Sequence, residues 1–274
     1  MTRGAQRAVA RFPQIEQQRR SGLPQDLIVN LTSYPVRYPT LAATIRSLLD
    51  QSVRAERTVL WLGWDNIDAL PEEVLALRDR GLEIRGCEDI GPYTKLLPAL
   101  ALWPDAFLVT ADDDVYYPPD WLLGLCATYD PASPAIVAWR AHLAKVDALG
   151  RVAPYAEWEM ATSRTRATDA GTGLFPTGVG GVLYPPGSLP AQVLRRDLFQ
   201  ALCPRQDDVW LYWMARLKGT PQVRVAKMLD LIEWPSSQSV GLRVDNVGAD
   251  GNDRHIRAME EVFGAFPLRA SAEN

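Results

Sequence analysis

Between residues 27 and 111, short apolar runs alternate with segments of helical periodicity, and few folds accommodate this alternation. The apolar runs cover residues 27–32, 57–63, 82–86 and 106–111, and the helix patterns between them cover 41–52, 71–81 and 93–103. Runs this short, rich in branched residues, are typical of buried strands. Strands that alternate with helices form a mostly parallel sheet covered by helices. We therefore expect an α/β domain.

The second half of the chain follows a looser order. Its strand patterns cover residues 135–142, 181–189 and 222–226, and its helix patterns cover 207–219 and 253–266. Two long segments, 167–181 and 233–253, are rich in glycine or serine, and loops of this length commonly carry function. With 274 residues, 47% of them hydrophobic, the chain can bury one sizeable core. A single domain over residues 26–270 is the expected organisation.

Residues 1–25 form a separate basic arm in this prediction. Arg3, Arg7 and Arg11 recur at helical spacing, and Glu16 is the only acidic residue among the first 20. Two interpretations are open: a solvated tail or surface helix, or an amphipathic segment that rests on anionic lipid or on a partner. Pro13 interrupts the helical pattern and weakens the second interpretation.

The composition excludes several classes of function. A net charge of −4 and a pI of about 5.3 do not match the basic footprint of a nucleic-acid-binding protein. No apolar run approaches the ~20 residues that span a bilayer, and no secretory signal pattern is visible. Three cysteines stand far apart in the sequence, as expected for thiols in a reducing cytosol. We therefore expect a cytoplasmic protein.

Three consecutive carboxylates, Asp112, Asp113 and Asp114, directly follow the strand expected at residues 106–111. Ligands of open α/β sheets bind outside the carboxyl ends of the strands, which is where these side chains would lie. An acidic turn is the alternative, but a turn needs only one aspartate. If strand geometry persists, Asp112 and Asp114 point to one side of the sheet and Asp113 points to the other.

The two histidines of the chain, His142 and His255, are too few for a metal site built from several imidazoles. A metal ion here must be held mainly by oxygen, which favours hard cations such as Mg²⁺ or Mn²⁺. We predict that Asp112 and Asp114 hold such a divalent cation. The cation could bridge the phosphates of a diphosphate ligand.

Six motifs, in order, give the chain a resemblance to a known family. They are "LTSYPVR", "GPYTKLLPAL", "DDDVYYPPDWL", "RAH", "TGVGGVLYPPGSL" and "DDVWLYWMA". Together they resemble bacterial family-2-like glycosyltransferases with the GT-A fold, which occur in gene clusters for surface polysaccharides. The resemblance covers roughly residues 27–265 and implies a three-layer sandwich with a mixed, mostly parallel sheet. The D-x-D element alone is weakly specific.

The resemblance implies a nucleotide-diphosphate sugar, most often a UDP-sugar, bound by residues 26–130, and a saccharide acceptor bound by residues 131–270. On the donor side it assigns Thr32, Ser33, Arg37, Lys95, Asp112 and Asp113. Two of these have an alternative role: Arg37 is either a phosphate contact or a surface arginine at a helix start, and Lys95 is either a phosphate contact or a solvated helix lysine. A growing or lipid-linked saccharide is the implied acceptor, which would place the enzyme at the inner face of the cell membrane. Whether the N-terminal arm makes that contact is left open by the sequence.

Asp207 and Asp208 open the helix pattern at 207–219. Similar inverting enzymes place a catalytic base at this position, because the acceptor hydroxyl must lose its proton as the new bond forms. A helix cap is the alternative role, since aspartate is favoured at that position. Only one of the two can be the cap, so we predict that one of them, with a lean toward Asp208, is the base.

The acceptor side is predicted less sharply. Gly180 and Gly181 match the acceptor segment of the family and would let the backbone approach a sugar, unless they form only a tight turn. His142 is either an acceptor contact or a packed structural residue, and His255 either a third metal ligand or a surface residue. Four aromatic residues could stack on sugars or belong to the core: Trp158, Tyr184, Trp210 and Trp213.

Two other functions fit part of the pattern. A sugar-phosphate nucleotidyltransferase would need a glycine-rich and lysine-rich loop after the first strand, and "LTSYPVR" has no glycine. A non-catalytic module that binds carbohydrate or Ca²⁺ would not need the carboxylates at 207 and 208. The glycine-rich stretch "GTGLFPTGVGG" matches neither a dinucleotide fingerprint nor a Walker loop.

Overall fold

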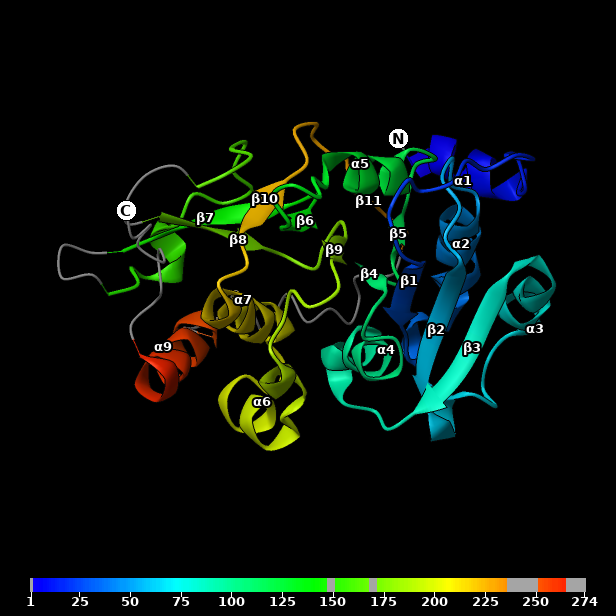
Figure 1. The fold of residues 1–274 in the computed structure, drawn as a ribbon. Helices are drawn as coiled ribbons and strands as arrows, with labels where there is room; N and C mark the ends of the chain where they lie inside the picture. The colour runs from blue at the N-terminus through cyan, green and yellow to red at the C-terminus, as the bar shows by residue number, and fades with distance from the viewer. Residues whose placement is uncertain (1, 147–150, 168–171, 236–250, 265–274) are drawn as a thin grey trace.

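The computed structural model describes residues 2–146, 151–167, 172–235 and 251–264. A seven-stranded sheet in these residues has the order β10-β6-β9-β4-β1-β2-β3 (Figure 1). Its strands are β1 (Leu27–Thr32), β2 (Arg57–Gly63), β3 (Leu82–Cys87), β4 (Phe107–Ala111), β6 (Ile136–Ala138), β9 (Val182–Tyr184) and β10 (Gln222–Arg224). Only β9 runs antiparallel to its neighbours, β4 and β6. The predicted mixed, mostly parallel sheet is confirmed.

Helices cover both faces of this sheet and give three layers. One face carries α2 (Tyr38–Leu49), α3 (Glu72–Leu75) and α5 (Trp121–Thr128). The other carries α4 (Leu97–Leu102), α6 (Arg196–Leu202), α7 (Asp207–Lys218) and α9 (Gly251–Phe263). Figure 1 shows α4, α6, α7 and α9 gathered on the same side of the strands. The predicted three-layer sandwich is therefore also confirmed.

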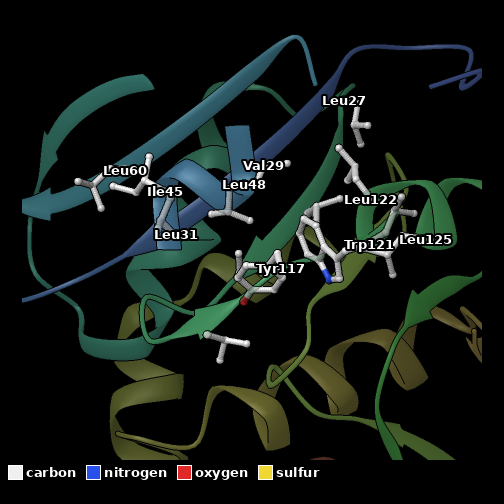
Figure 2. Packing of buried hydrophobic residues seen from close by; sticks show 14 of the residues in the cluster. Leu27, Val29, Leu31, Ile45, Leu48, Leu60, Tyr117, Trp121, Leu122 and Leu125 are labelled. Carbon is white, nitrogen blue, oxygen red and sulfur yellow. The ribbon is translucent and has the colours of Figure 1, made fainter. Parts of the chain in front are cut away.

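The core follows from the alternation of side chains along the strands. Leu27, Val29 and Leu31 of β1 lie in one buried cluster with Ile45 and Leu48 of α2 (Figure 2). Ile28, the residue between the first two, belongs to the cluster on the opposite face of the sheet. Burial of each large apolar side chain contributes about 1.5–3 kcal/mol, so a strand buried on both faces holds the centre of the sheet in register.

The strand predicted at 135–142 is two strands in the structure. After β6 the chain leaves the main sheet at Trp139 and Arg140 and continues as β7 (Ala141–Lys145), which pairs with β8 (Thr172–Pro176). Trp139 lies where the chain leaves the main sheet, and its indole N–H donates to the Trp121 carbonyl at 3.0 Å. Hydrophobicity alone could not show this change of partner, since both strands are buried.

Other elements also differ from the prediction. The helix expected at 71–81 is a short α3 followed by the 3-10 helix η3 (Ala76–Arg80), and the helix expected at 93–103 is η4 (Gly91–Lys95) followed by α4. Two further strands pair with each other: β5 (Val115–Tyr116), which directly follows the acidic triplet, and β11 (Ile232–Glu233). The sequence pattern missed α5, α6, β5, β8 and β11, because all are short.

The N-terminal segment is attached to the domain. After α1 (Thr2–Ala10), the carboxylate of Asp50 accepts the backbone N–H groups of Gln14 at 3.0 Å and Ile15 at 2.9 Å. Arg19 N donates to Ser52 O at 2.8 Å, so the segment runs along the end of α2. Arg3, Arg7 and Arg11 remain exposed. Across the described residues, the helices are all too short or too polar to span a bilayer.

Candidate active site

Residues that follow three of the strands lie along one edge of the main sheet. Because β1, β4 and β6 run in the same direction, the residues that follow them lie along the same edge. These residues are Ser33 after β1, the acidic triplet after β4 and Arg140 after β6. This is the edge at which open α/β sheets bind their ligands.

The three carboxylates of the triplet have different partners. Asp112 Oδ1 lies 3.2 Å from Lys95 Nζ, Asp113 Oδ2 accepts the hydroxyl of Ser33 at 2.6 Å, and Asp114 pairs with Arg37. The expectation that Asp112 and Asp114 share one side is therefore wrong in this structure: Asp113 and Asp114 both lie near Arg37, with Asp113 Oδ1 4.0 Å from its Nη1. The physical reason is that β4 ends at Ala111, so strand alternation does not continue through the triplet.

A second group of contacts holds the backbone of the triplet. Thr44 of α2 donates its hydroxyl to the carbonyl of Asp113 at 2.9 Å, and the indole N–H of Trp234 donates to Thr44 Oγ1 at 2.8 Å. Trp234 N also donates to the carbonyl of Asp114 at 3.0 Å. No sequence pattern predicts this support, because Trp234 lies more than a hundred residues from the triplet, in a loop without a recognisable pattern.

Lys95 joins the triplet to the second carboxylate pair. Its Nζ lies 3.2 Å from Asp112 Oδ1 and 3.2 Å from Asp207 Oδ2, and its side chain is only 11% exposed. Asp208 Oδ1 accepts the backbone N–H of Gly178 at 2.9 Å. Asp207 is buried, whereas Asp208 is partly open to solvent. The N-cap residue of α7 is Gln206, so neither Asp207 nor Asp208 occupies the cap position.

The charges at this site are not balanced. In the described part of the chain, two cations, Arg37 and Lys95, form ion pairs within this group of five carboxylates (Asp112, Asp113, Asp114, Asp207 and Asp208). Burial lowers the pKa of Lys95, but the charges of Asp207, Asp112 and Asp208 more than offset this and keep the ammonium protonated. Burial, helped by the neighbouring Asp114 charge, raises the pKa of Asp113 to about 6. Burial, followed by the Asp207 charge, raises the pKa of Asp208 to about 7.

This excess of negative charge suits a divalent cation. No group of three or more histidine, cysteine or acidic residues converges on one point in the part of the chain that the structure describes. Mg²⁺ commonly takes only one or two carboxylates from the protein and completes its shell with water and substrate phosphates. The surplus of carboxylates therefore fits a cation whose remaining ligands come from a bound diphosphate; Asp112 and Asp114, which face Lys95 and Arg37 in this structure, would have to turn toward that cation to hold it.

Of three predicted contact residues, His142 and Trp158 lie inside the protein and Thr32 is partly exposed. His142 is buried, its Nδ1 accepts the N–H of Ala161 at 2.8 Å, and burial together with the Arg140 charge lowers its pKa to about 4. Trp158 is 4% exposed and packs between Tyr155 and Phe175. Thr32 donates its hydroxyl to the Trp61 carbonyl at 2.9 Å. We leave His142 and Trp158 out of the acceptor site, because their side chains are enclosed.

The other uncertain candidates also belong to the interior. Tyr184, Trp210 and Trp213 are buried core residues. His255 is not at the surface: it is 6% exposed, and its Nδ1 lies 2.7 Å from the carbonyl of Leu202. In α9, therefore, this imidazole faces α6.

Gly180 and Gly181 accommodate a tryptophan. A Cβ on Gly181 would lie 2.6 Å from Cζ2 of Trp121, and the carbonyl of Gly180 accepts the Trp121 indole N–H at 2.6 Å. Both glycines have positive φ angles, of 92° and 98°, which other residues rarely adopt. The glycine beside the carboxylates is Gly178, which sequence analysis did not single out. A Cβ there would lie 2.9 Å from Lys95 Nζ.

Comparison with solved structures identifies the fold. The crystal structure of S. aureus TarS 1-349 is similar over 87% of this chain and 72% of that chain, with 14% identity and a TM-score of 0.51. The complex of the same protein with UDP covers the same shares, with 13% identity and a TM-score of 0.52. No protein-family model and no curated protein sequence matches the chain.

A third structure, the mannosyltransferase PcManGT from Pyrobaculum calidifontis with GDP-Man and Mn²⁺, is similar over 96% of this chain and 77% of that chain. Its identity is 12% and its TM-score is 0.45, a value too low to add to the argument. The two TarS structures and the sheet topology establish that the chain has the GT-A fold, as predicted. A fold is compatible with many activities, so the function has to be argued from the site.

Proposed function

We propose that this protein is a glycosyltransferase that moves a sugar from a nucleotide-diphosphate donor to a hydroxyl of a saccharide acceptor. The observation that carries the proposal is the meeting of the acidic triplet and the Asp207–Asp208 pair across Lys95, at the ligand-binding edge of a GT-A fold. The TarS complex supports the donor class, because that protein binds UDP on the same fold.

The donor binds along the ends of β1 and β4 in this proposal. Arg37 is held beside Asp113 and Asp114, where its guanidinium can also bind phosphate oxygens. Ser33 orients Asp113, and Lys95 orients Asp112. A divalent cation bound by Asp112, Asp114 and the donor phosphates would neutralise charge that develops on the departing diphosphate.

The acceptor hydroxyl is deprotonated by Asp208. Asp208 is partly exposed as a residue, and the N–H of Gly178 fixes one oxygen of its carboxylate. A raised pKa makes it a stronger base than an ordinary aspartate. Asp207 precedes Asp208 in α7 and pairs with Lys95. We propose direct attack of the hydroxyl on the sugar, with inversion at the anomeric carbon.

We further propose that the acceptor is a growing or lipid-linked saccharide in surface-polysaccharide synthesis, at the cytoplasmic face of the membrane. The exposed Arg3, Arg7 and Arg11 support contact with anionic lipid, because basic residues close to such a surface are attracted to it. Binding to vesicles with and without anionic lipid, compared before and after removal of residues 1–12, tests this contact.

Calorimetric titration with a panel of nucleoside diphosphates, with and without Mn²⁺, tests the donor site. We expect one diphosphate to bind only in the presence of Mn²⁺, and we expect Asp114→Ala to weaken its binding at least about tenfold, since a metal ligand is lost. Asp105→Ala, at an exposed position outside the site, should bind like the wild type. If none of the diphosphates binds with Mn²⁺, the proposed function is wrong.

Gly178→Ala is expected to lower kcat about 10- to 100-fold with little loss of stability. The added methyl group would lie 2.9 Å from Lys95 Nζ and 3.2 Å from Asp208 Oδ1, so both side chain ends must shift. Displacement of about 1 Å can cost a reaction two orders of magnitude. Gly4→Ala, which meets nothing within 4 Å, is the matched control. A Gly178→Ala variant with wild-type kcat would show that these two groups need not be held so closely.

A further inference from the structure

Arg140 lies on the same edge of the sheet as the acidic triplet but farther along it. It follows β6, and β9 separates β6 from β4 in the sheet order. Neighbouring strands are about 4.8 Å apart, so the backbone of Arg140 lies roughly 10 Å from the strand that ends at the triplet. This distance is about the length of one sugar ring with its linkage. Arg140 lies on the side of β4 that is away from β1.

The guanidinium of Arg140 differs from the other two cations of the site in its partners. Arg37 and Lys95 each contact carboxylates, whereas Arg140 Nη1 donates to the hydroxyl of Thr177 at 3.3 Å and forms no ion pair with a carboxylate in the described ranges. The same threonine donates its backbone N–H to the Arg140 carbonyl at 3.1 Å. Arg140 is therefore held in place, and Thr177 accepts from one of its five N–H donors, so other donors can bind another molecule.

Arg140 is also coupled to the proposed base. Thr177 directly precedes Gly178, whose N–H holds Asp208. Burial and the Asp208 charge raise the pKa of Tyr155 to about 12, while the Arg140 charge opposes this rise. Tyr155 therefore lies within reach of both groups. A partly buried cation without a counter-charge is unfavourable by itself, which is a reason to expect an anion to bind there.

We infer that Arg140 binds an anionic group, a phosphate or a carboxylate, carried by the saccharide acceptor. A guanidinium can make two parallel hydrogen bonds to either anion and so orient the acceptor hydroxyl toward Asp208. The anion bound by Arg140 is not the donor diphosphate. The donor lies at the triplet, where Arg37 and Lys95 contact the carboxylates, and β9 separates the triplet from Arg140. This inference rests on the proposed function and specifies its acceptor: a charged saccharide and not a neutral one.

The test is titration of protein saturated with Mn²⁺ and the diphosphate that binds. The probes are glucose, glucose 6-phosphate, glucuronate and methyl phosphate. We expect the charged probes to bind and glucose to bind far more weakly. Arg140→Gln should weaken the charged probes about 10- to 100-fold, Arg140→Lys should retain part of the affinity, and neither should change diphosphate binding. Arg11→Gln, at an exposed position, is the control and should bind like the wild type.

The outcomes separate this inference from the proposed function. Failure of every diphosphate to bind overturns both. The inference alone is overturned if the diphosphate binds normally but glucose binds as tightly as glucose 6-phosphate and glucuronate. It is also overturned if the diphosphate binds normally and Arg140→Gln binds the charged probes with the affinity of the wild type. Glucose 6-phosphate and glucuronate distinguish a phosphorylated from a uronic acceptor. Thermal unfolding is a second readout: a purely structural Arg140 predicts a lower Tm for Arg140→Gln, whereas a binding role predicts an unchanged or higher one.

Discussion

Replacement of Asp208 by Asn should lower kcat by about 10² to 10⁴-fold, which is the usual contribution of a general base. The amide keeps the shape of the carboxylate, and its oxygen can still accept the N–H of Gly178. It cannot take a proton from an acceptor hydroxyl. Binding of the nucleoside diphosphate should be unchanged, because Asp208 contacts neither Arg37 nor the triplet. Steady-state kinetics and calorimetry on the same variant check both parts.

The dependence of the rate on pH adds a signature to this prediction. The pKa of Asp208 is raised to about 7, so the carboxylate is protonated in acid and active above neutral pH. The wild-type rate should rise about tenfold per pH unit from pH 5 and level off above pH 7, and this limb should disappear in Asp208→Asn. If Asp208→Asn keeps most of its activity and Asp207→Asn loses it, the base is Asp207.

Replacement of Lys95 by Met should reduce the free energy of unfolding by about 3–5 kcal/mol. The ammonium is the buried cation between Asp112 and Asp207, and its loss would leave the buried Asp207 and the partly exposed Asp112 without this counter-charge. Methionine is of similar length, so the loss of packing is small. Urea unfolding followed by circular dichroism measures the difference.

Two further variants isolate the charge effect. Arg195→Met breaks an ion pair with Asp197 whose side chains are 58% and 60% exposed, and it should leave the unfolding midpoint unchanged. Lys95→Met combined with Asp207→Asn should recover part of the lost stability, because one of the unpaired charges is removed as well. A single Lys95→Met variant as stable as the wild type would contradict the role of Lys95 as a buried counter-ion.

Much of the fold could be predicted from local pattern. The segments at 27–32, 57–63, 82–86 and 106–111 are strands in the structure within a residue or so, because strands buried on both faces must be short, apolar and branched. The helix at 207–218 is equally clear, since its apolar positions repeat at helical spacing and Gly219 ends it. The elements that were missed are those too short to show a period.

The sequence by itself determined the α/β sandwich, the carboxylates at 112–114 and 207–208, and the place of the triplet at the end of a strand. Only the tertiary structure decided that Asp112 faces Lys95 while Asp113 and Asp114 face Arg37, that Gly178 and not Gly181 lies beside Asp208, and that His142 and Trp158 are enclosed. The reason is physical. Periodicity and turn chemistry act over a few residues, whereas the contacts of a site join side chains up to 190 positions apart, as in Thr44 and Trp234, and depend on how whole layers pack.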